Sequence, residues 1–485
     1  MTATPLSRRT LLARTAAAGL GIAVVGSAET VFGASPVSAA RAGGKAGKVG
    51  GKVGYGPLLS DPFGRLALPR GFSYKLIAQA GVTTLETGEP TPDRPDGTAA
   101  FPRANGRGSV LVQNHEIGSY STAPGLSPVP LLAGYVYDPG AGGGTTNIEV
   151  DARGNRVREY VSLAGTNNNC AGGVTPWGTW LTCEETEQRK GGVFLKDHGY
   201  VFEVHPTDDQ QNRDPQPIRC LGRYAHEAAA VDPDTGIVYL TEDASGPHGL
   251  LYRWTPPAGL RPRRAGAFKA LSATAGTLAA LKAVDARGDL VPDLSVATRI
   301  GQTYRAEWVT VPDRDAQTVS TRKQFSYPEG KAGEGLAGAI TRSRKLEGAW
   351  WGDDGFYFVA SFARTADGSL AQHDGQVWFY DPKTSRIRLV LRFGFTPTDQ
   401  NSDTDGPDNI TVSPYGGLFL AEDGEGKQHL VGATSTGKTF TFAENQLPGD
   451  EEFTAPNFSP DGQTLFANVQ IPGHTFAITG PFREV

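Results

Sequence analysis

The chain has 485 residues, of which 38% are hydrophobic and 20% are charged. These proportions are typical of a globular protein with a large core or with two or three domains. Its 63 glycines and 34 prolines favour many turns and short strands over long helices. The net charge of −5 provides no electrostatic case for nucleic acid, so we expect no nucleic-acid partner.

Residues 1–39 have the parts of an export signal in the usual order. A twin-arginine pattern (SRRTLL, 7–12) precedes an apolar run at 16–28, and small residues around Ala39 offer cleavage sites. A disordered basic tail is the alternative. The signal predicts export by the twin-arginine machinery, which carries folded proteins, and hence a secreted or periplasmic location.

The segment after this signal, residues 40–56, is rich in glycine and lysine and predicts a flexible linker. No later apolar run approaches the roughly 20 residues that a membrane span needs, so we expect no stable membrane anchor.

From residue 57 the chain repeats one unit, in which an apolar strand is followed by a strand built around aromatic residues. The six predicted pairs are 110–112 with 135–138, 177–182 with 200–204, 237–241 with 250–254, 356–361 with 377–381, 418–421 with 429–432, and 464–469 with 475–478. Such repetition of small sheets predicts an all-β fold, an irregular six-bladed β-propeller with insertions over residues 57–485. A β-sandwich or another all-β domain is the alternative.

One stretch has a helical composition. Residues 266–284 (GAFKALSATAGTLAALKAV) are rich in alanine, leucine and lysine, which predicts a helix. We place it in a long insertion at about residues 256–348, between the third and fourth strand pairs.

Four predicted strands end in acidic residues: 109–116 (SVLVQNHE), 178–185 (GTWLTCEE), 236–243 (GIVYLTED) and 417–423 (GLFLAED). Equivalent strands of a propeller end at one mouth of its channel, so these acids are expected to meet. Crowded carboxylates repel each other unless cations lie between them, so the pattern predicts a polynuclear metal site. The candidates are Glu116, Glu184, Glu185, Glu242, Asp243, Glu422 and Asp423.

Three further segments supply acidic candidates for the same site. Asp403, Asp405 and Asp408 occupy a tight turn (DTDGPDN) and offer hard oxygen ligands of the kind that Ca²⁺ prefers. Glu227 lies in GRYAHE, before an alanine run that indicates burial, and a buried glutamate needs a cation or a firm hydrogen-bond partner. Glu347 lies between apolar residues in RKLEGAWW.

The three cysteines, Cys170, Cys183 and Cys220, leave at least one thiol unpaired. Cys183 and Cys220 could form a disulfide. Cys170 lies in a polar, glycine-rich segment (TNNNCAGG) that is a poor place for a packing residue. A thiolate there suits iron, copper or zinc better than calcium, and it predicts a mixed site with one soft ligand among carboxylates.

Several of these segments together resemble the PhoX-type alkaline phosphatases, from about residue 57 to the C-terminus and in the same order. They are NHE (114–116), NNNCAGG followed by TPWGTWLTCEE (175–185), GRYAHE (222–227), LEG (346–348) and DGPDN (405–409). The resemblance implies a six-bladed propeller that acts as an exported phosphomonoesterase. It also implies a cofactor of two irons and several calcium ions bridged by an oxo group.

Residue by residue, the resemblance makes Cys170, Glu227 and Glu347 iron ligands. It makes calcium ligands of Glu184 or Glu185, with Asp405, Asp408 and Glu422. Asn114 would contact the substrate phosphate. Arg342, Arg344 and Lys345 compete for the role of the basic residue that grips phosphate, and Arg344 and Lys345 are our candidates.

The sequence supports a monomeric, metal-dependent phosphomonoesterase whose substrate is a phosphate monoester. Two alternatives stay open. One is a calcium-dependent propeller lactonase or phosphotriesterase that needs only oxygen ligands. The other is a non-catalytic propeller that binds a partner and uses calcium for rigidity.

Overall fold

A computed structural model represents the protein, and the structure describes residues 53–120, 125–207, 209–260, 262, 264–325, 339–396 and 404–485. These residues are almost entirely β-strand and loop. Their helical turns are five short 3₁₀ segments: η2 (Asp209–Asn212), η3 (Arg219–Leu221), η4 (Leu294–Val296), η5 (Thr321–Gln324) and η6 (Thr365–Asp367). Among them, no helix has the length and apolar character to cross a membrane.

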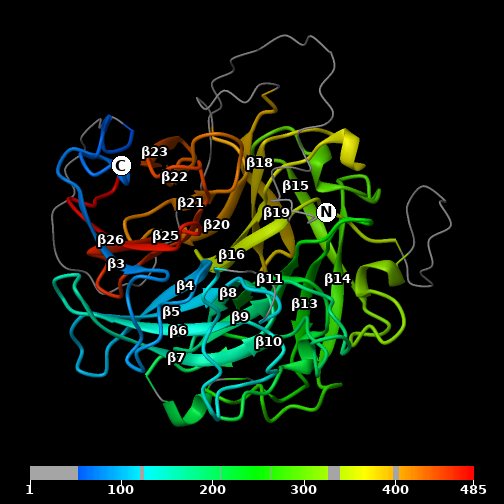
Figure 1. Ribbon diagram of the computed structural model, residues 1–485. Helices are drawn as coiled ribbons and strands as arrows, with labels where there is room; N and C mark the ends of the chain where they lie inside the picture. Colours follow the sequence, from blue (N-terminus) through cyan, green and yellow to red (C-terminus); the bar gives the residue numbers. More distant parts are fainter. Residues whose placement is uncertain are drawn as a thin grey trace, which may run out of the picture.

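The strands form five antiparallel sheets, which lie around a centre like the blades of a propeller (Figure 1). Two sheets consist of consecutive strands. One contains β4 (Pro95–Pro102), β5 (Ser109–His115), β6 (Gly143–Val150) and β7 (Arg156–Thr166), and the next contains β8 (Asn169–Val174), β9 (Trp180–Glu184) and β10 (Val201–Val204).

The largest sheet has nine strands, because β15 bridges two consecutive meanders by pairing with both β14 and β19. One meander contains β11 (His226–Val231), β12 (Val238–Glu242), β13 (Leu251–Thr255) and β14 (Thr277–Val284), followed by β15 (Thr303–Thr310). The other contains β16 (Leu346–Gly352), β17 (Gly355–Ala360), β18 (Gly375–Asp381) and β19 (Arg386–Phe393).

The last two sheets join the two ends of the described chain. One runs from β20 (Pro407–Val412) through β21 (Leu418–Glu422), β22 (His429–Ala433) and β23 (Thr439–Asn445) to β2 (Leu66–Pro69) and β1 (Leu58–Leu59). The other contains β24 (Phe453–Phe458), β25 (Thr464–Val469), β26 (His474–Thr479) and β3 (Ser73–Gln79). Figure 1 shows β3 (blue) beside β26 (red), a pairing that closes the ring of sheets.

Six strands surround the centre: β4, β8, β11, β16, β20 and β24. Each contacts the next, and β24 contacts β4 again, so they form a closed ring. Small residues permit this close approach. A Cβ on Gly173 would lie 1.7 Å from the Ala229 carbonyl oxygen, and one on Gly348 would lie 2.9 Å from that of Asp408. The hydrophobic cores fill the spaces between neighbouring sheets and include Trp180, Trp254 and Trp378.

The same irregularity begins each of these inner strands. In five of them the first residue pairs with the last residue of the following strand, and the register then shifts over the next two residues. These pairs are Pro95–His115, Asn169–Glu184, His226–Glu242, Leu346–Ala360 and Pro407–Glu422. A β-bulge bends the strand and redirects its side chains, so the second residue of each strand takes a special direction.

Five of the six predicted strand pairs are confirmed, as β9–β10, β12–β13, β17–β18, β21–β22 and β25–β26. The first pair is wrong, because β5 pairs with β6 whereas residues 135–138 make only an isolated bridge at Val136. The predicted helix is also wrong, since its second half is β14 and pairs on both sides. The strands form five sheets, so the six predicted blades do not appear as six separate sheets.

Three other predictions concern the termini and the cysteines. The export signal at 1–39 and most of the linker at 40–56 lie outside the described residues. Cys183 and Cys220 do not form a disulfide, and Cys170, Cys183 and Cys220 are all buried free thiols. Cys183 and Cys220 belong to one hydrophobic cluster, where they pack as small apolar residues.

Candidate metal centre

Nine side chains with metal-binding atoms meet where the inner strands begin. They form four overlapping groups, and within each group the ligand atoms all lie within 4.8 Å of one another. The groups are Asp96, Glu116 and Cys170; Cys170, Glu185 and Glu227; Glu227, Glu347 and Asp408; and Asp408, Asp423 and Glu452. Neighbouring groups share a residue, so eight carboxylates and one thiol form a continuous cluster, which we call the central cluster.

Two kinds of backbone position supply most of the central cluster. The first kind is the second residue of an inner strand, at the bulge: Asp96, Cys170, Glu227, Glu347 and Asp408. The second kind is the residue directly after the neighbouring strand, which holds Glu116 after β5, Glu185 after β9 and Asp423 after β21. Glu452, directly before β24, represents the remaining inner strand.

Glu227 is surrounded by other carboxylates and has no access to solvent. Its side chain is fully buried, and neither carboxylate oxygen has a hydrogen-bond partner among the described residues. Burial raises the pKa of Glu227 well above its usual range, and Glu347, Glu185, Asp408 and Asp96 raise it further. A charged Glu227 therefore requires a cation, since an unpaired buried carboxylate is very unfavourable.

The rest of the central cluster has the same character. Burial, followed by neighbouring carboxylates, raises the pKa of both Asp408 and Glu452 well above the usual range. The pKa of the Cys170 thiol is raised for the same two reasons, with Asp96 and Glu227 as its strongest neighbours. The donor set fits bound cations, because the carboxylates suit hard ions such as Ca²⁺ and the thiol suits a transition metal.

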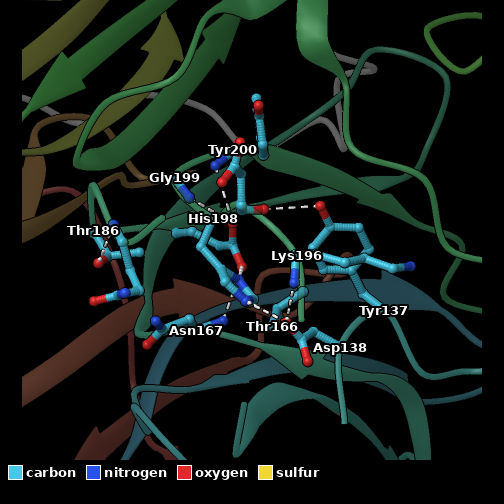
Figure 2. Close-up of polar contacts among 12 residues, drawn as sticks. Tyr137, Asp138, Thr166, Asn167, Thr186, Lys196, His198, Gly199 and Tyr200 are labelled. Carbon is cyan, nitrogen blue, oxygen red and sulfur yellow. Dashed lines mark hydrogen bonds and ion pairs between the residues drawn. The ribbon is translucent and has the colours of Figure 1, made fainter. Parts of the chain in front are cut away.

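The structure does not bring Glu184 and Glu422 into the central cluster. The carboxylate of Glu184 lies 2.6 Å from His198 Nδ1 and accepts hydrogen bonds from the backbone N–H groups of Asn167, Gly199 and Tyr200. Figure 2 labels these four partners. Burial opposes a charge on His198, but Glu184 and Asp138 outweigh it and raise the pKa of the imidazole. Glu184 thus anchors the loop that carries His198.

The other strand-terminal acids are used similarly. Glu422 lies 2.8 Å from His429 Nδ1, and Glu242 accepts hydrogen bonds from Tyr252 and Arg322. Successive side chains of a strand point to opposite faces, so the residue after each of these acids is directed toward the centre. Glu185 and Asp423 occupy that next position, and Asp243, which follows Glu242, forms an ion pair with Lys345 at 3.4 Å.

Asp405 lies beside the central cluster and outside its four groups. Its Oδ2 accepts the backbone N–H of Glu425, and its own N–H donates to Glu422 Oε1. Burial raises the pKa of Asp405 to about 7, against the opposing hydrogen bond from Glu425 and with support from Glu422 and Asp374. Asp403, from the same predicted turn, lies outside the described residues.

Of the three basic candidates, Lys345 reaches the central cluster. Its Nζ lies 2.6 Å from Glu347 Oε1, and its backbone has a positive φ of 48°, which is unusual for a residue other than glycine. Arg344 instead pairs with Asp367 at 3.1 Å and stacks on Phe362, and Arg342 donates to the backbone carbonyls of His248 and Arg322.

Asn114 holds the backbone of the segment that carries Cys170. Its Nδ2 donates to the carbonyl oxygens of Cys170 (2.7 Å) and Ala171 (2.8 Å), and its Oδ1 accepts the indole N–H of Trp180. Both amide hydrogens are thereby used, and the side chain is fully buried. The structure places Asn114 as a support for the bulge that presents Cys170 and leaves it no hydrogen for a substrate phosphate.

Asn114→Asp tests this support. The substitution keeps the shape of the side chain. It replaces the amide NH₂ group, which donates two hydrogen bonds, with a carboxylate oxygen that faces the same two carbonyl oxygens. We expect a loss of stability of about 1–3 kcal/mol for each buried group left unsatisfied, measured by denaturation, together with a loss of the metal held by Cys170. The matched control is Asn147→Asp in β6. It breaks a buried hydrogen bond to the carbonyl oxygen of Pro206, and it should lower stability without any loss of metal. A normal melting temperature with a raised KM would instead restore Asn114 as a substrate contact.

Two members of the central cluster, Asp96 and Glu452, were not among the sequence candidates. Asp96 lies in PDGT. This segment resembles HEAA, LEGA and PDNI, in which an acid is the second residue of an inner strand, and the resemblance could have identified Asp96. Glu452 lies one residue before β24 and carries no comparable signal.

The sequence matches the model of one protein family, described as alkaline phosphatase PhoX, over residues 53–158 and 151–473. No curated protein matches the chain. Among solved structures, a gluconolactonase from Xanthomonas campestris is 12% identical with a TM-score of 0.40, and the alignment covers 88% of this chain and 99% of that one. Hydrazine synthase from Kuenenia stuttgartiensis is 12% identical with a TM-score of 0.39, over 83% of this chain and 99% of that one. Similarities this weak support no functional assignment.

Proposed function

This chain belongs to the PhoX alkaline phosphatase family, and we propose that it is an exported phosphomonoesterase that depends on iron and calcium and releases inorganic phosphate. The observation that carries the proposal is Glu227, a fully buried carboxylate with no hydrogen-bond partner among the described residues, at the middle of eight converging acids. Family membership supports a phosphatase, and the central cluster supports its dependence on cations.

In this proposal the central cluster divides by ligand chemistry. Cys170, Glu227 and Glu347 would hold iron, because the thiol is a soft ligand and these residues belong to adjoining groups. The remaining carboxylates would hold calcium: Asp96, Glu116, Glu185, Asp408, Asp423 and Glu452. They replace Glu184 and Glu422, whose oxygens are engaged by histidines and backbone N–H groups. Bound cations supply activation of an oxygen nucleophile and neutralisation of the charge on the phosphoryl group.

Lys345 supplies the phosphate contact in this proposal. Its ammonium group lies at the edge of the central cluster, where ion pairs with Glu347 and Asp243 hold it. A cation in that position can attract a phosphate dianion and stabilise charge on its oxygens. Arg344, held by Asp367 and Phe362, adds positive potential behind Lys345.

The wider organisation is part of the same proposal. We count the nine-stranded sheet as two blades, which gives six blades whose first strands are the six inner strands. Residues 1–39 would direct export through the twin-arginine machinery, with the protein functioning as a monomer outside the cytoplasm. Loading of cations before export would suit a route that carries folded proteins.

Hydrolysis of p-nitrophenyl phosphate at alkaline pH tests the proposed function. We expect the exported protein to hydrolyse this ester, prolonged chelation to abolish the activity, and iron together with calcium to restore it. Calcium alone or iron alone should not restore it, because each ion fills only part of the central cluster. Activity that survives chelation, or that calcium alone restores in full, would contradict the proposal.

A further inference from the structure

The residue directly after the second strand of each meander occupies an equivalent position around the centre. The six residues at this position are Glu116, Glu185, Asp243, Ser361, Asp423 and Gln470. Three of them, Glu116, Glu185 and Asp423, lie within 4.8 Å of the bulge residue of their own sheet. In the equivalent register at β16 and β17, Leu346 pairs with Ala360, so the same direction, toward Glu347, is expected of the Ser361 side chain.

Ser361 is a buried hydroxyl at a position where other meanders carry acids. Its side chain is fully buried, and its Oγ has no hydrogen-bond partner among the described residues. Its backbone N–H donates to the carbonyl oxygen of Lys345 at 2.9 Å, so the two residues are fixed side by side. An unsatisfied buried hydroxyl is unfavourable for folding, so the Ser361 hydroxyl is available to donate to a ligand that reaches it.

The chemistry of the position indicates that ligand. A carboxylate can only accept hydrogen bonds when it is ionised, whereas a hydroxyl can also donate one. A phosphate oxygen needs donors and positive charge, and Lys345 supplies the charge next to Ser361. Gln470, the other neutral residue of the six, already donates to Asp96 and Glu116 and serves the ligands instead.

We propose that Ser361 Oγ donates a hydrogen bond to the phosphate group of the substrate, beside Lys345. This assignment rests on the proposed function for the identity of the ligand, and it adds a residue that binds the substrate through a neutral donor. Because Ser361 is neutral where four of the other equivalent residues are acids, the negative charge is lower on this side of the central cluster, and an anion can approach there.

Ser361→Ala tests the assignment, with inorganic phosphate as the probe. We expect the affinity for inorganic phosphate, measured by calorimetry on the metal-loaded protein, to fall roughly 10- to 100-fold, and kcat/KM for p-nitrophenyl phosphate to fall similarly. The melting temperature without phosphate should stay the same or rise, because the substitution removes an unsatisfied hydroxyl. Ser361→Asp, which restores the acid of the other meanders, should abolish phosphate binding while the metal content is kept.

Ser162→Ala is the matched control. Its hydroxyl is also buried but lies 2.6 Å from Thr145 Oγ1, so its loss should lower the melting temperature and leave phosphate affinity unchanged. Phosphate affinity of Ser361→Ala equal to that of the wild type would overturn the assignment, whether or not stability changes. If the wild-type protein binds phosphate but hydrolyses no monoester, the proposed function is wrong. The phosphate affinities of the wild type and of Ser361→Ala would still decide the role of Ser361. A wild-type protein that binds no phosphate would overturn both.

Discussion

Glu227→Gln is expected to remove the phosphatase activity and, at the same time, to stabilise the metal-free protein. Glu227 belongs to two groups of the central cluster, so its loss disturbs cations on both sides. Removal of one preorganised electrostatic group from a site typically costs on the order of 10²–10³-fold in kcat, and we expect at least this loss. The relevant measurements are kcat with p-nitrophenyl phosphate and denaturation in the presence of chelator.

The gain in stability has a separate cause. Without cations, Glu227 is a buried acid that faces Glu347, Glu185 and Asp408, and glutamine has nearly the same shape without the charge. Glu159→Gln is the matched control, because Glu159 is equally buried but accepts hydrogen bonds from Thr91, Thr146 and Arg156. That control should lose stability and keep its activity. Equal destabilisation by the two substitutions would contradict the account.

The second large effect is a pH dependence that appears when the metals are removed. The carboxyl groups of Glu227, Asp408 and Glu452 have raised pKa values in the folded protein, and the pKa of Asp405 is raised to about 7 by burial and neighbouring acids. A carboxyl group with a raised folded pKa stabilises the fold fully below its unfolded pKa, near 4, and this stabilisation is lost as the pH rises through the folded value. The metal-free protein should therefore melt at progressively lower temperature from about pH 5 to pH 9.

Bound cations should remove most of this slope, because they replace the protons between the carboxylates. The difference in melting temperature between the metal-loaded and metal-free forms should consequently grow with pH. Glu242 and Asp405, whose pKa values are each raised to about 7 by burial and which lie outside the central cluster, should leave a smaller slope in both forms. A metal-free protein whose melting temperature stays level or rises over this range would show that the acids do not depend on cations.

The apolar strands were predictable from the sequence, whereas the inner strands were not. β12, β17 and β25 are rich in β-branched, leucine and aromatic residues and lie between glycine-containing turns, which is the usual signal of a buried strand. The inner strands β8 and β11 (NCAGGV and HEAAAV) lack this signal, because the crowded centre selects glycine and alanine where side chains would collide. Their role becomes visible only through their contacts across the ring.

The acidic doublets were located correctly in the sequence but not resolved to single residues. In Glu184–Glu185 and Glu422–Asp423 the first acid binds a histidine and the second enters the central cluster. The direction of each side chain depends on the residue at which the strand ends, and sequence patterns place such ends only to within one or two residues. The mistaken helix has a different origin, since alanine, leucine and lysine favour a helix while pairing with β13 and β15 imposes a strand.

Elemental analysis of the exported protein and of Cys170→Ala tests the central claim most directly. Metal-binding side chains from all six inner strands or their immediate starts converge, five acids and the Cys170 thiol, and bound cations make their closeness tolerable. We expect the purified wild-type protein to contain both iron and calcium in more than one equivalent in total, and Cys170→Ala to lose iron while it retains calcium. A folded, active wild-type protein with no more metal than a denatured control would contradict the account.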